Sequence, residues 1–270
     1  MLFSIIFELT TDRPARLPPF LGRANHAQFL AWIGQIDPAL ARDLHEADQL
    51  RPITCSSLQH ARLDGDMLRV RAGETYAVRI TSLHPDLSAR LDQWLRIRPP
   101  TEWPLHNHAF AVTAIYCDAD RHAWSGLTTY EETASVHLLG RTQPERKLAF
   151  ELASPTAFKS QGMHLPVPLP GLLFGSLLDR WNAFSPVELP VDLRAYAETA
   201  VAVSYYRLQT ERVSYKRQSV LIGATGRITY TALDTDRYWL AALNVLADFA
   251  LYCGVGIKTT VGLGQVRRSI

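Results

Sequence analysis

The chain has 270 residues, 47% of them hydrophobic, and a formal net charge of +2 at pH 7. This length suits one large domain or two ordinary ones, and the apolar content allows a complete core. The near-neutral charge excludes a protein that binds nucleic acid through bulk positive charge alone. No apolar run approaches the length of a membrane span, and Met1 to Thr10 lacks a basic export signal, so we expect a cytoplasmic protein without membrane contact.

Positive charge is concentrated in the last quarter of the chain. Residues 1–200 contain 19 Lys and Arg against 22 Asp and Glu, whereas residues 201–270 contain nine against four. Arginine accounts for 24 of the 28 basic residues, and its planar guanidinium suits two-point phosphate contacts and stacking on bases. Genome composition can produce the same excess of arginine, so the position of the charge carries more weight than its type.

The first half of the chain predicts the order strand, helix, two strands, helix, strand. Asn25 with Gln28 three positions on has the pattern of a helix capping box, and Asp37 before Pro38 predicts a second helix start. Predicted strands are 2–9, 68–70, 76–80 and 110–116, and a further helix is predicted at 82–98. This order is that of the ferredoxin-like, split βαβ fold.

The second half repeats this architecture loosely. Predicted strands are 135–139, 148–152 and parts of 200–230, and predicted helices are 172–184 and 236–251. The last helix is strongly apolar and ends at Gly254, the residue type expected just after a helix C-terminus. No internal sequence repeat is visible, so the similarity of the halves depends on element order alone.

The stretch from Gly254 to Gln265, called the glycine-rich segment below, holds four glycines, one lysine and two threonines in twelve residues. Glycine permits positive φ and close backbone approach, so neighbouring amides can point together at an anion. A helix stop followed by a glycine-rich hairpin is the alternative, but the combined pattern favours a phosphate-bearing ligand. The candidate binding residues are Gly254, Gly256, Lys258, Thr259, Thr260, Gly262 and Gly264.

The glycine-rich segment does not match the known nucleotide-binding motifs. A P-loop needs glycine directly before its lysine, where this chain has Ile257, and it follows a strand rather than a helix. The dinucleotide motif fails as well, because Thr259 occupies the position of its third glycine. We therefore do not expect nucleotide hydrolysis.

A predicted hairpin just before the last helix alternates aromatic and basic residues. The aromatic residues are Tyr205, Tyr206 and Tyr215, and the basic ones are Arg207, Arg212, Lys216 and Arg217. Such a surface can stack bases and neutralise phosphates, although a solvated hairpin with one buried tyrosine face fits the spacing equally well. Its proximity to the glycine-rich segment favours RNA.

The sequence contains no metal-binding signature. Its three cysteines form no CxxC pair, and His106 and His108 in a predicted loop have no third ligand. RNA cleavage without metal needs an acid and base of near-neutral pKa and a cation for the phosphorane. His45 falls at a predicted helix C-terminus, which favours its imidazolium form and suits a general acid. Arg51 can supply the cation. His26 falls at a predicted helix N-terminus, which favours its neutral form and suits a general base. Each histidine taken alone is more often a surface or core residue.

Four stretches resemble the repeat-processing endoribonucleases of CRISPR systems, the Cas-six family of the RAMP superfamily. They are 249–265 with the glycine-rich segment, 25–56 with Leu44-His45-Glu46, Ser154 to Lys159, and Gly223 to Tyr230. They occur in the family's order and span nearly the whole chain. The terminal glycine-rich signature is specific to RAMP proteins.

The resemblance implies an α+β fold of two tandem ferredoxin-like (RRM-like) domains, residues 1–125 and 126–270, with repeat RNA bound along the interdomain surface. It implies cleavage without metal or cofactor, in which the ribose 2′-hydroxyl attacks the adjacent phosphate and leaves a 2′,3′-cyclic phosphate and a 5′-hydroxyl. The expected ligands are CRISPR repeat RNA and mature crRNA, and other proteins of an interference complex are candidate partners.

The family's usual acid/base histidine matches His45, and Arg51 falls where some members have lysine. A tyrosine of some members falls at Gln35, so the second proton-transfer group stays open, with His26 as the candidate. Lys159 in the central motif joins the candidate RNA contacts.

Two other functions are alternatives to the nuclease. A non-catalytic RAMP subunit that holds guide RNA is disfavoured by the intact Leu-His-Glu segment followed by Arg51, and an unrelated ferredoxin-like metabolite binder would not bind RNA tightly at moderate salt.

Overall fold

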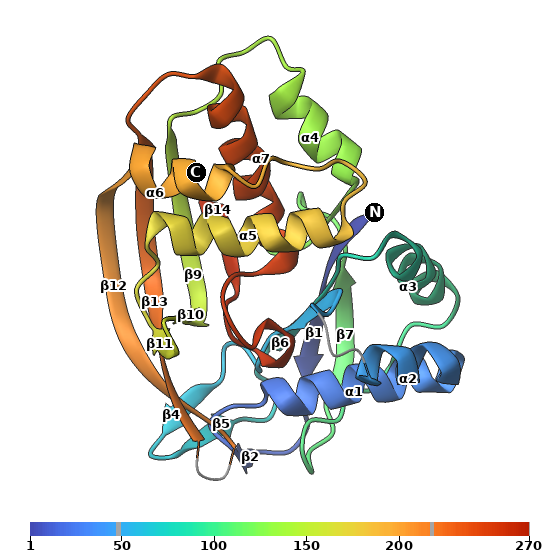
Figure 1. Cartoon of the computed structure of the whole chain (residues 1–270). Helices are drawn as coiled ribbons and strands as arrows, with labels where there is room; N and C mark the ends of the chain where they lie inside the picture. Colours follow the sequence, from blue (N-terminus) through green and yellow to red (C-terminus); the bar gives the residue numbers. More distant parts are fainter. Residues whose placement is uncertain (47–49, 217–218, 270) are drawn as a thin grey trace.

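The N-terminal half is an antiparallel sheet with helices on one face. A computed structural model describes residues 1–46, 50–216 and 219–269 (Figure 1). The strands in sheet order are β3 (Ile53–Cys55), β6 (Tyr76–Ser82), β1 (Leu2–Thr10) and β7 (Ala111–Tyr116), and β8 (Gly126–Thr128) pairs with the start of β1. The helices are α1 (Gly22–Ile36), α2 (Pro38–Glu46) and α3 (Pro85–Ile97), and a second small sheet contains β2 (Ala15–Leu17), β5 (Met67–Val70) and β4 (Arg62–Asp64).

Alternation along β1 separates two faces of this sheet. Phe3 and Phe7 join the core with Phe29 and Ile33 of α1, because side chains two apart on a strand share a face. Trp103 stacks on Phe7 with 4.7 Å between ring centroids. On the other face of the strand, Leu2 packs into the core of the C-terminal half.

The C-terminal half is a second antiparallel sheet with helices packed on one face (Figure 1). Its strands in sheet order are β12 (Val201–Lys216), β13 (Ser219–Ala232), β9 (Lys147–Thr156) and β14 (Val266–Ser269). Its helices are α4 (Tyr130–Leu138), α5 (Pro170–Phe184), α6 (Leu193–Ala200) and α7 (Arg237–Cys253), and the smaller elements are β10 (Phe158–Ser160), β11 (Met163–Leu165) and the 3-10 helix η1 (Thr259–Val261). Phe150 of β9 packs between Phe174 of α5 and Tyr230 of β13.

The two sheets have the same topology. In each half the four main strands, numbered in chain order, lie in the sheet order second, third, first, fourth: β3-β6-β1-β7 and β12-β13-β9-β14. This is the order of the ferredoxin-like fold, so the predicted α+β, tandem ferredoxin-like architecture is confirmed. The domain division at residue 125 stays a prediction, and β8, directly after it, still pairs with β1. None of the helices in the described ranges is long and apolar enough to cross a membrane.

The predicted strand at 135–139 is wrong, because these residues belong to the end of α4. Thr129 caps this helix: its side chain accepts a hydrogen bond from the Glu132 amide, and the Glu132 carboxylate accepts one from the Thr129 amide. This reciprocal capping box fixes the helix start, and Tyr130 and Ala134, four residues apart, supply the buried face. The apolar run alone did not reveal the helical period.

The predicted start of α1 is also wrong, because the helix begins at Gly22 rather than at Asn25. A Cβ on Gly22 would lie 1.9 Å from the Val261 carbonyl oxygen, so the close approach of the glycine-rich segment requires glycine there. By contrast, the predicted end of α7 is confirmed. Gly254 follows the last helical residue with φ 62°, and Asp236 caps the other end through the Tyr238 and Trp239 amides.

Candidate functional site

The glycine-rich segment lies against the first turn of α1 and the end of β3, across the boundary between the halves. Gly22 contacts Val261, and Gly262 forms an isolated parallel bridge with Ser56. A Cβ on Gly262 would lie 3.0 Å from the Ser57 amide nitrogen, and this residue has φ 104°. The fold thus brings together two candidate regions, the segment and the histidine-bearing helices, that are more than 200 residues apart in sequence.

The glycines of this segment serve packing and backbone conformation rather than an open array of amides. Eight of its twelve backbone amides already donate hydrogen bonds within the protein, for example Val255 to the Gly264 carbonyl and Gly256 to Ser176 Oγ. A Cβ on Gly256 would meet the Ala157 carbonyl oxygen at 2.2 Å. These eight amides are therefore not available to an anion, which limits the expected binding by backbone amides to the rest of the segment.

Only part of the glycine-rich segment reaches the surface. Lys258 is exposed in a left-handed conformation with φ 59°, and Gly256 and Thr260 are half-buried. The buried candidates of this segment are Gly254, Thr259, Gly262 and Gly264. A ligand on this surface would meet Lys258 first.

His45 and Arg51 act electrostatically on His26, which lies about one turn along α1 from Gly22, the residue that contacts the glycine-rich segment. Arg51 Nη2 donates a hydrogen bond to the His45 carbonyl oxygen at 3.1 Å, which ties Arg51 to the end of α2, where the His45 side chain is exposed. His26 is buried in α1, and burial, followed by the charges of Arg51, His45 and Arg23, lowers its pKa to about 4. His26 is therefore neutral at pH 7, as expected, although the cause is burial among cations and not a helix terminus.

One nitrogen of His26 has no hydrogen-bond partner. Nε2 is buried and accepts or donates no hydrogen bond to any described residue. A buried polar atom without a partner is rare in folded proteins and costs stability. The imidazole thus has one unused hydrogen-bonding position, and this position is shielded from solvent in the structure.

Asn25, next to His26, fixes the position of α1. Its Nδ2 donates to the Ser56 carbonyl at 2.9 Å, and its Oδ1 accepts from Trp103 Nε1 at 2.9 Å. Asn25 is fully buried, so this network sets where the His26 backbone lies relative to β3. The sequence pattern misassigned Asn25 as a helix cap, because its partners are 31 and 78 residues away.

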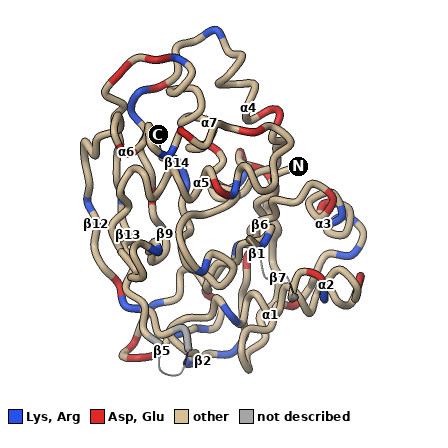
Figure 2. The backbone as a smooth tube through the Cα atoms, viewed as in Figure 1, with Lys and Arg blue, Asp and Glu red and all other residues tan. Residues whose placement is uncertain are grey.

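The predicted basic hairpin is formed by β12 and β13. Tyr205 and Tyr206 are exposed and, as neighbours on a strand, point to opposite faces, so they do not form one stacking platform. Basic residues follow this edge strand in Figure 2. Arg207, Arg212 and, on β10, Lys159 are exposed; Arg217 lies outside the described residues, and only the backbone of Lys216 is described.

A cleft of about 820 Å³ joins this hairpin to the N-terminal half. Its walls include Ser56 and His60 on one side and Arg212, Glu151 and Gln265 on the other. Of the described residues of the glycine-rich segment only Gln265 lines this cleft, so the cleft connects the hairpin to the end of the segment.

Among the described residues no group of three or more His, Cys, Asp or Glu side chains is arranged to hold a metal ion. His108 Nε2 lies 2.9 Å from Thr11 Oγ1 instead, and His106 has a left-handed backbone in an exposed loop.

Family models match both halves of the chain. The model described as "CRISPR Cas6 N-terminal domain" matches residues 1–134, and that described as "CRISPR-associated endoribonuclease Cas6" matches residues 150–266. The chain belongs to the Cas6 family. Two curated Cas6 endoribonucleases show partial similarity: that of Mycobacterium tuberculosis (strain CDC 1551 / Oshkosh) is 34% identical over 129 residues, or 46% of this chain, and that of Streptococcus thermophilus is 28% identical over 116 residues, or 42%. The matched segments span 40% and 47% of these relatives, less than half of each.

Solved Cas6 structures resemble the whole chain. The structure described as "Cas6 (TTHB231) product complex" has a TM-score of 0.81 and 28% identity, with all of both chains covered. The "Cas6 (TTHA0078) substrate mimic complex" has a TM-score of 0.72 and 27% identity, with 99% of each chain covered. A structure titled "An RAMP protein binding different RNA substrates", at 17% identity and a TM-score of 0.64, shares the fold.

Proposed function

We propose that this chain is a metal-independent endoribonuclease that cleaves CRISPR repeat RNA and so matures precursor crRNA. The observation that carries the proposal is the proximity of His45 and Arg51 to His26, on the helix whose first turn contacts the glycine-rich segment. Membership of the Cas6 family and similarity to Cas6 complexes with product and substrate mimic support it.

In the proposed mechanism the ribose 2′-hydroxyl attacks the adjacent phosphate. Neutral His26 accepts the 2′-hydroxyl proton, His45 donates a proton to the departing 5′-oxygen, and Arg51 stabilises the charge on the phosphorane. The products are a 2′,3′-cyclic phosphate and a 5′-hydroxyl, so the bonds and protons balance without a cofactor. A phosphate bound among these cations opposes their effect on His26 and raises its pKa toward the range useful for a base.

The proposed RNA contacts surround this cluster. Lys258 and Thr260 lie on the exposed side of the glycine-rich segment, and Arg207, Arg212 and Lys159 are exposed on the C-terminal half. Because Arg212 borders the interdomain cleft, one strand of RNA can contact the hairpin and the glycine-rich segment together. We propose that the buried glycines Gly254, Gly262 and Gly264 form the framework of this surface.

Single-turnover cleavage of a repeat RNA in excess EDTA tests the proposal. We expect His45→Ala to slow cleavage by about 10²- to 10⁴-fold and His26→Ala by about 10²-fold, since each removes one proton-transfer group. His106→Asn is the matched control: it removes an exposed loop histidine at a backbone position with φ 57°, which asparagine tolerates. A wild-type protein that binds repeat RNA and leaves it uncut would favour the non-catalytic RAMP subunit instead.

A further inference from the structure

Two buried arginines hold the glycine-rich segment, one from each half of the molecule. Arg79 extends from β6 with 0% exposure, and Arg180 extends from α5 with 8%. Arg79 Nη1 donates to Gln265 Oε1 at 2.6 Å, and its Nη2 donates to the Leu251 carbonyl in the last turn of α7. Arg79 thus fixes both ends of the connection between α7 and β14.

Arg180 holds the middle of the same segment. Its Nη2 donates to the Gly256 carbonyl at 2.7 Å and lies 3.5 Å from Thr259 Oγ1. Its Nη1 donates to Ser176 Oγ at 2.6 Å, and this oxygen in turn accepts the Gly256 amide at 2.9 Å. Both polar groups of the Gly256 backbone are therefore engaged by one turn of α5.

Neither arginine is neutralised by a carboxylate. The buried residues of the described chain include no Asp or Glu, and neither guanidinium forms an ion pair with a described residue. The charge of Asp179 acts on Arg180, but this carboxylate is exposed and forms its ion pair with Arg194 at 2.7 Å. Burial lowers the pKa of Arg79 to about 9, which leaves its guanidinium charged at pH 7.

Two buried positive charges behind one surface segment are costly for the folded protein. Removing a charge from water without an opposite charge is unfavourable, and apolar residues of similar volume often fill such sites with better stability. Hydrogen bonds to carbonyl oxygens satisfy the donors but leave the net charge. An anion on the outer side of the glycine-rich segment would offset this charge.

We infer that Arg79 and Arg180 are positioning residues that fix the glycine-rich segment and, through their uncompensated charge, give its outer surface the positive potential that attracts RNA phosphates. This inference rests on the proposed function, because RNA is the anion it names. Most amides of the segment bond internally and do not attract phosphate. The inference supplies another source of attraction, namely the buried charge behind the backbone together with exposed Lys258.

Binding of an uncleavable repeat RNA, with a 2′-deoxy nucleotide at the cleavage site, tests the role of the charge. Arg79→Gln and Arg180→Gln keep a hydrogen-bond donor and remove the charge, whereas Arg180→Lys keeps the charge. At about 0.1 M salt and pH about 6, where a buried lysine is more readily protonated, we expect each glutamine variant to bind roughly tenfold more weakly and Arg180→Lys to stay within about threefold of wild type. Arg96→Gln, which removes an exposed charge paired with Asp92 on α3, should bind like wild type.

Wild-type affinity in both glutamine variants would overturn the inference. Equal loss in folded Arg180→Lys and Arg180→Gln, with folding checked by thermal melting, would also overturn it, because a purely structural role predicts that result. If Arg79→Gln does not fold, the Arg180 pair decides. The RNA is uncleavable, so wild-type protein that binds it but cuts no normal repeat would refute the proposed nuclease and leave this test intact.

Discussion

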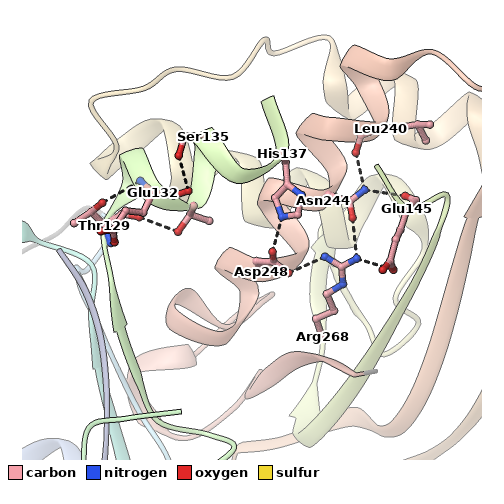
Figure 3. Close-up of polar contacts among 10 residues, drawn as sticks. Thr129, Glu132, Ser135, His137, Glu145, Leu240, Asn244, Asp248 and Arg268 are labelled. Carbon is pink, nitrogen blue, oxygen red and sulfur yellow. Dashed lines mark hydrogen bonds and ion pairs between the residues drawn. The ribbon is translucent and has the colours of Figure 1, made fainter. Parts of the chain in front are cut away.

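Two polar clusters of this protein differ in whether their positive charges have carboxylate partners. At the junction of α4, α7 and β14, Asp248 lies between His137 and Arg268: 2.5 Å separates its Oδ2 from His137 Nε2, and Arg268 Nη1 donates to its Oδ1 at 2.8 Å (Figure 3). Arg268 Nη2 also reaches Glu145 at 2.8 Å and Asn244 at 2.8 Å. The guanidinium of Arg268 thus has two carboxylate partners, Asp248 and Glu145.

Around the glycine-rich segment the balance is different. The groups that act on buried His26 are the cations Arg51, His45 and Arg23, and the two buried arginines bond to neutral oxygens. Paired charges secure the end of the chain to the helices, whereas accumulated positive charge prepares a surface for an anion. The comparison therefore separates the part of the protein that stabilises the fold from the part that we propose binds and cleaves RNA.

Apart from the two histidines, the largest effect on the cleavage rate should follow from a change at Arg51. We expect Arg51→Gln to slow single-turnover cleavage by about 10²-fold, because it removes positive charge at the phosphorane, and Arg51→Lys to slow it by less than about tenfold. Quench-flow or gel kinetics at saturating repeat RNA measures both rates. Equal rates for the two variants would contradict a role for the Arg51 charge.

Asp248→Asn should lower the stability of the fold and leave cleavage nearly unchanged. The change leaves His137 and Arg268 without their shared carboxylate, and we expect a loss of about 2 kcal/mol in the free energy of unfolding. Urea denaturation measures this loss. Cleavage at saturating RNA should stay within about twofold of wild type, and a cleavage defect in the folded variant would contradict the separation of the two clusters.

The two clusters should also respond to acid in different pH windows. The His26 pKa falls from 6.5 to about 4 on folding, so the unfolded chain binds more protons between these values, and stability drops by about 2 kcal/mol from pH 7 to pH 5. Burial opposes ionisation of Asp248, but His137 and Arg268 hold its pKa below the usual value, so its contribution is lost only below about pH 3.8. Urea denaturation of wild type and His26→Gln at pH 7 and pH 5 measures their free energies of unfolding. An equal loss between the two pH values in both proteins would contradict the assignment of this loss to His26.

The smallest effect concerns the edge strand β12. Tyr206 is 69% exposed, and we expect Tyr206→Ala to weaken RNA binding by about 1 kcal/mol if a base stacks on it. Tyr238 at the start of α7 is 51% exposed and gives a matched control, Tyr238→Ala. Fluorescence anisotropy with labelled repeat RNA measures both affinities, and equal values would remove Tyr206 from the proposed surface.

The sequence predicted the features of the fold that depend on local pattern. Apolar runs located β1, β6, β7 and β9, and the Gly254 end of α7 was readable from residue type. The apolar runs missed β3 and β14, and the strand predicted at 68–70 lies in the small sheet as β5 rather than in the main sheet. The start of α1 was not readable, because Gly22 is there to admit Val261, a contact between chain ends. The prediction of a strand at 135–139 failed, because the capping box of Thr129 and Glu132 starts the helix α4 upstream of these residues.

The candidate site was predicted only in part for the same reason. The resemblance to a known family pointed to His45 and Arg51, and the structure places them with His26. Arg79 and Arg180 had no signal in the sequence, because their partners in the glycine-rich segment lie 186 and 76 residues away. Long-range hydrogen bonds of buried residues leave no local pattern.

Cleavage of two matched repeat RNAs in excess EDTA tests the central claim most directly. One RNA is all-ribose, and the other carries a single 2′-deoxy nucleotide at the cleavage site. The proposed mechanism predicts that wild-type protein cuts the first to a 2′,3′-cyclic phosphate and a 5′-hydroxyl, and binds the second without cutting it. Cleavage of the deoxy RNA at the same position, or dependence of the all-ribose reaction on added divalent metal, would contradict it.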